Sequence, residues 1–250
     1  MPRRWEWHVR FQQLSSREEL ASEWGGLSHG IQKCMLPIEG RPILAHIMEN
    51  LLHAFGGAEV VIALGYKPDS VCDYFGSSYC DGRISIRYVY SSEQLETRRR
   101  LLLADKFLTG PFLYLAGDVI SAPEQLLRVA ESYHGYANSA VDVMGVISVA
   151  VDHSPAISHA LVREQNNIAT EMAYPPTEQW ATGFYREMGI AYFGPKFIPR
   201  LKEATSEQPY LSHVISQAIR EGTIFGVSTY LKAWYHFLRP DDCRDIAIHF

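Results

Sequence analysis

The chain has 250 residues, 47% of them hydrophobic and 20% charged, a composition ordinary for a globular protein. Its net charge of −5 gives no electrostatic basis for binding nucleic acid, and no apolar run reaches the roughly 18 residues of a transmembrane helix. The N-terminus has no signal-peptide core and the four cysteines form no C-x-x-C pair, so we expect free thiols in a cytoplasmic protein.

Strand-like and helix-like segments alternate through the first half of the chain. Apolar residues recur on one side of 43–55, and Gly56 and Gly57 follow, which predicts a helix with a glycine stop. The next predicted elements are strands at 59–65, 84–91 and 111–118 and helices at 68–78, 92–108 (with Ser92 as N-cap) and 122–136. This order predicts an α/β fold with a Rossmann-like, doubly wound, mostly parallel sheet. Its ligand cleft should lie at the carboxyl ends of the strands, where the strand order reverses.

The second half is less regular. It predicts strands at 139–151 and 187–194, a helix at 209–222, one long strand or a strand pair at 223–237, and a capped C-terminal helix at 239–250. The sequence shows no internal repeat, low-complexity tract or linker, so we expect a single domain over residues 1–250.

Four short motifs, in this order and spacing, resemble the sugar-1-phosphate nucleotidyltransferases, the family that makes nucleoside-diphosphate sugars. "QKCMLPIEGRPIL" resembles its P-K-x-L-L-P-v-x-G-K-P-l-i, "SEQLET" its E-x-x-L-G-T, "LAGD" its strand ending in G-D, and "GIAYF" its G-i-Y-x-F. The match covers about residues 31–120 well and 185–245 loosely. It implies a GT-A-like nucleotidyltransferase fold with a nucleotide-binding half over about 1–135 and a sugar-phosphate half over about 136–250.

The resemblance implies transfer of a nucleoside monophosphate from a nucleoside triphosphate to a sugar 1-phosphate, or a similar phosphorylated small molecule, with release of pyrophosphate. Such an enzyme needs a cation at the phosphates, Mg²⁺, and a carboxylate to hold the metal. The positions that match family residues are Lys33 and Asp118 (catalytic), Thr97 and Gly117 (nucleotide), Glu171 and Gly189 (sugar), and Asp118 and His236 (metal). Each also has a structural interpretation: a loop lysine is commonly solvated, and Asp118 could cap the next helix. A homo-oligomer or an active paralogue is a possible partner.

Three departures from the family pattern count against catalysis. The family's L-A-A-G-x-G-T-R-L loop is replaced, so that its glycines fall on Glu19 and Ala21 and its arginine on Glu23. Carboxylates there would repel a triphosphate. His236 stands where the family often has a second metal-binding aspartate, and Glu171 has no lysine after it, unlike the family's E-K-P.

A frameshift in the gene is one hypothesis for the replaced glycine loop. Back-translation of Ser15–Gly25 with one choice of codons, read one base later, gives A-A-G-K-N-S-P-R-N-G, which restores the family's A-A-G. The N-terminal segment (1–24) would then carry a frameshift relative to an active ancestor, and sequencing the gene tests this.

Three further classes of function have different degrees of support in the sequence. A catalytically inactive relative that binds a nucleotide sugar, or regulates an active paralogue, stays open. A metal-dependent glycosyltransferase ranks low because the chain has no D-x-D, and a Ser-His-Asp hydrolase ranks lower because it has no G-x-S-x-G.

Overall fold

The structure is a computed structural model that describes most of the chain. It covers residues 8–12, 32–65, 67–93, 95–151, 160–174, 183–232, 234–237, 240–243 and 246–248. The replaced glycine loop, with Glu19, Ala21 and Glu23, and the back-translated stretch 15–25 of the frameshift hypothesis lie outside these residues.

The described residues form a ten-stranded mixed sheet in the order β10-β11-β13-β9-β12-β7-β1-β4-β6-β5. Its strands are β1 (His8–Gln12), β4 (Ala58–Leu64), β5 (Ser78–Tyr79), β6 (Ile84–Tyr90), β7 (Phe112–Ala116), β9 (Gly145–Ala150), β10 (Leu161–Gln165), β11 (Ile168–Ala173), β12 (Phe184–Phe193) and β13 (Phe225–Tyr230). Strands β7, β1, β4 and β6 are parallel neighbours, which confirms the doubly wound first half. Strand β12 runs antiparallel to both β7 and β9, so the second half is mixed.

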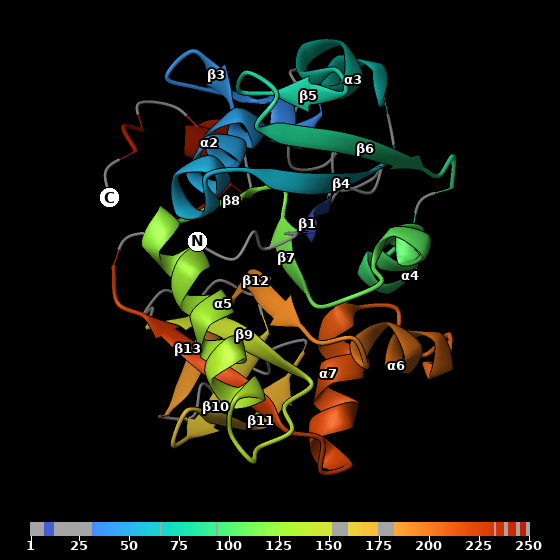
Figure 1. The fold of residues 1–250 in the computed structure, drawn as a ribbon, viewed down its shortest axis with the longest axis vertical. Coiled ribbons are helices and arrows are strands. Elements are labelled where there is room, and N and C mark those ends of the chain that lie inside the picture. Colours follow the sequence, from blue (N-terminus) through green and yellow to red (C-terminus); the bar gives the residue numbers. More distant parts are fainter. Residues whose placement is uncertain are drawn as a thin grey trace.

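Helices cover both faces of the sheet (Figure 1). They are α2 (Ile43–Phe55), α3 (Asp69–Phe75), α4 (Thr97–Leu102), α5 (Pro123–Ala137), α6 (Phe197–Glu203) and α7 (Leu211–Arg220). One core cluster joins α2, α3 and α5 to one face, and a second joins α4, α6 and α7 to the other. Strand β4 shows why: Val60 and Ile62 belong to the first cluster, Val61 and Ala63 to the second, since neighbouring strand residues point to opposite faces.

Most predicted elements are confirmed, and two helices are wrong in extent. Helix α2 ends at Gly56, whose φ of 73° allows the left-handed cap. The helix predicted from Ser92 instead starts at Thr97, because the side chain of Ser91 accepts a hydrogen bond from the Glu93 amide and holds the preceding residues in a turn. The C-terminal helix is reduced, among the described residues, to the 3₁₀ turn η4 (Pro240–Cys243).

The hairpin of β10 and β11 had no counterpart among the predicted elements. Its two turn residues, Asn166 and Asn167, have φ values of 55° and 59°, which is the left-handed conformation that a tight two-residue hairpin turn requires. Asparagine tolerates this conformation well, so the Asn-Asn pair was an available signal.

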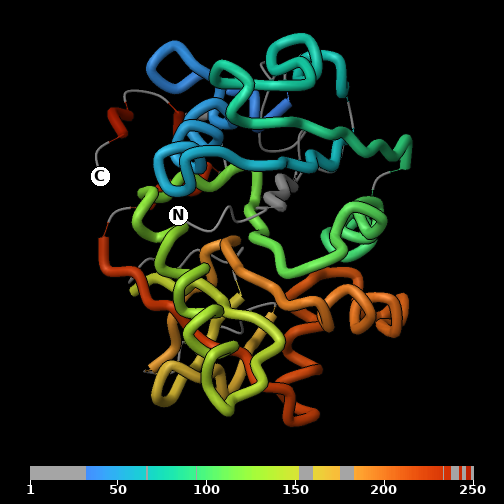
Figure 2. The backbone as a smooth tube through the Cα atoms, in the orientation of Figure 1, coloured from blue at the N-terminus to red at the C-terminus, as the bar shows by residue number. Residues whose placement is uncertain are grey.

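The segment 223–237, predicted as one long strand or a strand pair, forms two separate strands. After β13 the chain forms β14 (Tyr235–His236), which pairs antiparallel with β8 (Val119–Ile120) in a separate small sheet. Trp234, Tyr235 and Ile246 then pack against the core cluster that contains α2, and the red C-terminal trace accordingly returns toward blue α2 (Figure 2). The hairpin of β2 (Pro37–Ile38) and β3 (Arg41–Pro42) leads into α2.

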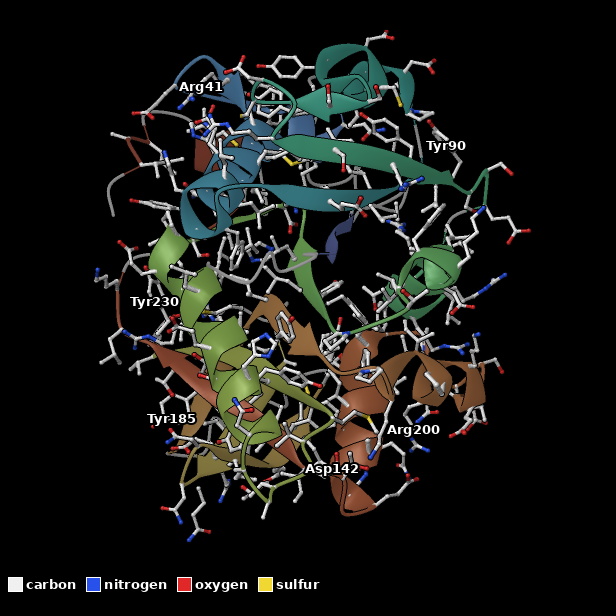
Figure 3. All side chains as sticks on the ribbon, viewed as in Figure 1. Arg41, Tyr90, Asp142, Tyr185, Arg200 and Tyr230 are labelled. Atoms are coloured by element: carbon white, nitrogen blue, oxygen red, sulfur yellow. The ribbon has the colours of Figure 1, made fainter. Side chains whose placement is uncertain are left out.

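Charged side chains at the surface form exposed ion pairs. Arg41, Asp142 and Arg200, labelled in Figure 3, pair with Glu49, Lys196 and Glu221 respectively. Such pairs contribute about 0–1 kcal/mol each, so the two apolar layers carry most of the stability. Among the described residues, no helix has the length and apolar character needed to cross a membrane.

Gly145, the first residue of β9, generates a prediction about stability. A Cβ at Gly145 would lie 2.8 Å from the carbonyl oxygen of Tyr192 and 2.8 Å from the ring of Phe193. Because backbone cannot move aside cheaply, Gly145→Ala should destabilise the protein by roughly 2 kcal/mol, measured by urea unfolding. Gly110→Ala is the matched control, since its Cβ meets nothing within 4 Å. Equal stability of the two variants would contradict this close packing.

Candidate functional site

The strand order of the sheet reverses next to β1. The chain proceeds from β1 to β4 and β6 on one side, and then crosses to β7 on the other side of β1. In doubly wound sheets the ligand cleft lies outside the carboxyl ends of the strands at this switch point. Strand β7 ends at Ala116, so Gly117 and Asp118 lie where the sequence predicted the cleft.

A buried ion pair joins Lys33 to Asp118. The Nζ atom of Lys33 lies 2.8 Å from Oδ2 of Asp118, and the two side chains are 7% and 2% exposed. Lys33 begins the short 3₁₀ turn η2 (Lys33–Met35), and Gln32 before it donates a hydrogen bond to the carbonyl of Lys67 at 2.6 Å. The structure therefore brings together the two side chains that the sequence paired across 85 residues.

His236 reaches the same carboxylate from the C-terminal part of the chain. It pairs with Val119 in the β14–β8 ladder, and the Phe237 amide donates a 3.0 Å hydrogen bond to the carbonyl of Asp118. These backbone bonds place Nε2 of His236 3.4 Å from Oδ2 of Asp118, where the imidazole is a charged partner only when protonated.

Electrostatics keep Asp118 ionised. Burial by itself raises the pKa of Asp118, but the charges of Lys33 and His236 outweigh burial and hold the pKa well below the usual 3.8. The pKa of the Cys34 thiol is raised to about 12 by burial and by the charge of Asp118, so Cys34 stays protonated and is a poor nucleophile.

The carboxylate of Asp118 is the candidate metal ligand of the site. Its second oxygen, Oδ1, is buried and has no hydrogen-bond partner among the described residues. The described residues contain no group of three or more metal-binding side chains. Mg²⁺ is commonly bound by one or two carboxylates together with substrate phosphates, so Asp118 fits a magnesium ion that arrives with a nucleotide. The imidazole of His236 fits magnesium poorly, since that ion prefers oxygen.

A cavity beside Asp118 gathers four of the residues predicted from the sequence. Thr97, Asp118, Gly189 and His236 all line it, and its volume is about 130 Å³. Typical ligand pockets measure about 300–1,000 Å³, so this space suits a small group rather than a whole nucleotide. The hydroxyl of Thr97 accepts a 2.8 Å hydrogen bond from the Leu211 amide and thereby caps the start of α7.

Glu187 lines the same cavity and was not among the predicted site residues. Strand β12 is irregular here: Gly189 has a φ of 71°, and its amide donates a 2.7 Å hydrogen bond to the Glu187 carboxylate. A Cβ at Gly189 would lie 2.8 Å from that of Ala116, so only glycine fits beside β7. Burial raises the pKa of Glu187 to about 7, and the Gly189 hydrogen bond partly offsets this. A carboxylate two residues before a motif glycine, in an apolar strand, was the available signal.

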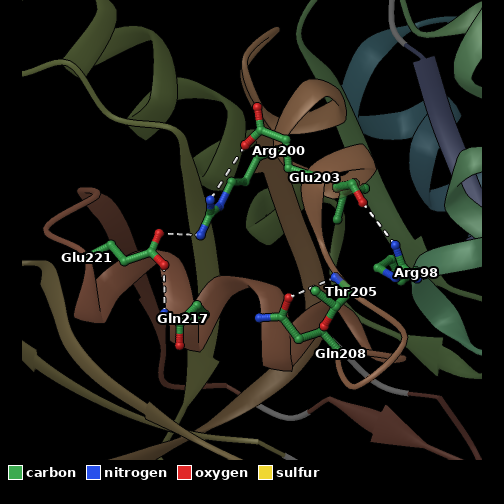
Figure 4. Close-up of polar contacts among 8 residues, drawn as sticks. Arg98, Arg200, Glu203, Thr205, Gln208, Gln217 and Glu221 are labelled. Atoms are coloured by element: carbon green, nitrogen blue, oxygen red, sulfur yellow. Dashed lines mark hydrogen bonds and ion pairs between the residues drawn. The ribbon is translucent and has the colours of Figure 1, made fainter.

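The structure does not bring Glu171 into this cavity. Glu171 is exposed on β11, 3.5 Å from Arg163, and lies along a separate, open groove. The polar groups of that groove largely satisfy one another: Arg200 pairs with Glu203 and Glu221 (Figure 4).

Three consecutive arginines, 98–100, lie at the start of α4, and two of them donate hydrogen bonds to backbone carbonyls. Arg98 donates hydrogen bonds to the carbonyls of Leu201 and Ala204, at the end of α6, and Arg100 is buried and donates to the carbonyl of Leu95. Arg99 is exposed and pairs with Glu93, so this run provides no cluster of phosphate-binding cations.

The buried ion pair generates a prediction that a double-mutant cycle tests. Lys33→Met leaves a buried carboxylate without its lysine and should cost about 3–5 kcal/mol at pH 7, whereas Lys33→Met combined with Asp118→Leu should recover most of this loss. Because the pKa of Asp118 is depressed, its stabilisation is present above the usual value of 3.8 and is lost as the pH falls further. Lys196→Met, which breaks an exposed pair, is the control and should cost under about 1 kcal/mol. Additive effects at Lys33 and Asp118 would contradict coupling.

Comparison with known proteins supports the family resemblance. No protein-family model matches the chain. A bifunctional protein GlmU of Methanococcus maripaludis is 35% identical over 88 residues, which is 35% of this chain and 20% of that protein. The CMP-5'-(3-aminopropyl)phosphonate synthase of Streptomyces rubellomurinus is 26% identical over 240 residues, covering 92% of this chain and 37% of the synthase. The chain thus spans about a fifth to two fifths of the length of these two curated relatives.

Solved structures share the fold over nearly the whole chain. A UDP-glucose pyrophosphorylase complexed with UDP-glucose matches with a TM-score of 0.78 at 15% identity, over 96% of each chain. A putative glucose-1-phosphate thymidylyltransferase from Bacillus anthracis matches with a TM-score of 0.77 at 15% identity, over 98% of each chain. The chain therefore has the fold of these sugar-phosphate nucleotidyltransferase structures and is similar in sequence to the two curated proteins named above.

Proposed function

We propose that the chain transfers a nucleoside monophosphate from a nucleoside triphosphate to a sugar 1-phosphate, or to a similar phosphorylated small molecule, and releases pyrophosphate. The observation that carries the proposal is the buried pair of Lys33 and Asp118 at the carboxyl end of β7, beside a cavity. The name of the CMP-5'-(3-aminopropyl)phosphonate synthase describes a nucleotide-linked product of this class of reaction, which supports the proposal.

In this reaction the protein mainly positions two polyanions, the nucleoside triphosphate and the acceptor phosphate. An oxygen of the acceptor phosphate attacks the α-phosphorus, a new P–O bond forms, and the bond to the β-phosphate oxygen breaks as pyrophosphate leaves. The attacking oxygen is largely deprotonated at neutral pH, so no side chain has to remove a proton.

Lys33 and Asp118 would then exchange partners when substrate binds. Lys33 releases Asp118 and donates to phosphate oxygens, which are equally anionic, and Asp118 becomes free to hold Mg²⁺. Asp118 would hold the ion, which would supply charge neutralisation at the transferring phosphates. Gly117 leaves room for the nucleotide to approach the backbone after β7. Thr97 lies on the nucleotide side of the cavity in this proposal.

The names of the similar proteins differ in base and acceptor. They include uridine, thymidine and cytidine products, and acceptors from glucose 1-phosphate to an aminopropylphosphonate and inositol 1-phosphate. The proposal is therefore made for the reaction, with the nucleotide held by about residues 1–135 and the acceptor by about residues 136–250.

A catalytically inactive relative that binds a nucleotide sugar is the second candidate. The contact between His236 and Asp118 favours it, because an imidazole stands where the family often has a second metal-binding carboxylate. The replacement of the family's glycine and arginine positions by Glu19 and Glu23 also favours the inactive relative.

Pyrophosphate release tests the first candidate. The purified chain, given Mg²⁺, each nucleoside triphosphate and a panel of sugar phosphates and other phosphorylated acceptors, should release pyrophosphate with at least one pair. Lys33→Ala and Asp118→Asn should each lower kcat/KM by roughly 100-fold or more, because each removes a charge from the transferring phosphates. Lys196→Ala, on the exposed pair, should leave kcat/KM unchanged. Release by neither wild type nor any variant would rule the activity out.

Thermal stabilisation separates the two candidates. An active enzyme should be stabilised by a triphosphate in a magnesium-dependent way, by roughly 2.7 kcal/mol at a ligand concentration of about 100 times Kd. Binding of a nucleotide sugar in calorimetry, without turnover, supports the inactive relative. A chain that binds no nucleotide and no nucleotide sugar would contradict both candidates.

A further inference from the structure

The cavity beside Asp118 is lined by several side chains that have no role in the proposed transfer step. Glu187 supplies a carboxylate, and four aromatic rings line the same space: Tyr114, Tyr174, Phe193 and Tyr210. The rings lie in two pairs. Those of Tyr174 and Tyr210 meet edge to face at 5.3 Å between centroids, and those of Tyr114 and Phe193 lie 6.2 Å apart.

A carboxylate with aromatic rings around it suits a positively charged group. The rings have electron-rich faces that attract ammonium and quaternary amines, and a carboxylate forms a charge-assisted hydrogen bond or ion pair with them. Burial raises the pKa of Glu187 to about 7, so burial disfavours its charged form in this wall. A bound cation would stabilise that charged form, whereas a neutral hydroxyl group would stabilise it less.

Charged groups also lie at two places along the site. Lys33 and Asp118 form their ion pair at one end, where in the proposed function the acceptor phosphate meets the triphosphate and Lys33 donates to phosphate oxygens. Glu187 lies on the cavity wall, and Gly189, two residues on, packs beside Ala116 at the end of β7. A molecule with an anionic phosphorus group at one end and a cation at the other would complement both ends.

We propose that the acceptor is a small phosphate or phosphonate that carries an amine, with its ammonium group held by Glu187 and the rings of Tyr174 and Tyr210. This rests on the proposed function and narrows its substrate class. The cavity of about 130 Å³ has room for such a head group. The amine takes no part in bond making: a phosphate or phosphonate oxygen attacks the α-phosphorus, and pyrophosphate leaves as before.

The same walls could receive a neutral sugar ring. A sugar would stack on the tyrosines and donate a hydroxyl hydrogen bond to Glu187. That alternative predicts little preference for a positive charge, so a matched pair of acceptors that differ only in charge separates the two.

The experiment compares phosphocholine with its neutral carbon isostere, 3,3-dimethylbutyl phosphate, and 3-aminopropylphosphonate with butylphosphonate. Glucose 1-phosphate is the sugar acceptor. Pyrophosphate release is measured at pH 8, above the pKa of Glu187, with Mg²⁺ and each nucleoside triphosphate. Binding of the same acceptors is measured separately by calorimetry, with and without nucleotide.

Wild type should prefer the charged member of at least one pair by about tenfold or more in kcat/KM or affinity, and should prefer it over glucose 1-phosphate. Glu187→Gln keeps the shape and removes the charge, so it should reduce this preference to about twofold or less. Glu131→Gln, an exposed carboxylate on α5, is the control and should leave the preference intact.

The other outcomes overturn one proposal or the other. Equal use of both members of each pair, or preference for glucose 1-phosphate, overturns the amine proposal while the transfer activity stands. Absence of pyrophosphate with every acceptor contradicts the proposed function, and the calorimetric preference then decides the amine proposal by itself. If Glu187→Gln does not fold, the wild-type comparison of charged and neutral acceptors needs no variant and still tests the preference for an amine.

Discussion

The buried ion pair between Lys33 and Asp118 is the interaction on which the site depends. Two charges removed from water at this depth are stable only while each has a partner. Lys33 can leave Asp118 only for another anion, and Asp118 can release Lys33 only for another cation. In the proposed function, a triphosphate with a magnesium ion would provide both at once, so the arrangement would couple binding of the nucleotide to binding of the metal.

Two backbone features aim the remaining side chains at this pair. The β14–β8 ladder holds His236 against Asp118, although the two are far apart in the chain. Strand alternation places Glu187 on the same face of β12 as Gly189, Ala191 and Phe193, which all line the cavity, and the register shift between Glu187 and Ala191 leaves that face unchanged. Strands β12 and β14 belong to the second half of the chain, which adds an antiparallel strand and a C-terminal return to a parallel sheet. The ion pair at the switch point thus comes from the first half, and the walls of the cavity come mainly from the second.

The distribution of charge sets this cavity apart from the open groove on β11 and α7. In the groove, Arg200 is already satisfied by Glu203 and Glu221, so it offers little to a ligand. In the cavity, the Oδ1 atom of Asp118 has no partner among the described residues, and Glu187 is held at a raised pKa by burial. Poorly solvated charge that faces a cavity is the more usual mark of a binding site.

The amino-acid order alone was enough to predict the alternation of strands and helices, the glycine stop of α2 at Gly56, and the placement of Lys33 and Asp118 at one edge of the sheet. The alternation and the glycine stop follow from local periodicity. The placement of Lys33 and Asp118 followed from the resemblance to the nucleotidyltransferase motifs, together with the rule that the cleft lies at the carboxyl ends of the strands. Three-dimensional packing was needed to show that Glu171 faces a separate groove and that Glu187 faces the cavity. Alternation along β12 puts Glu187 on one face of its strand, but only the pairing of β12 with the distant strand β7 decides that this face borders the cavity beside Asp118.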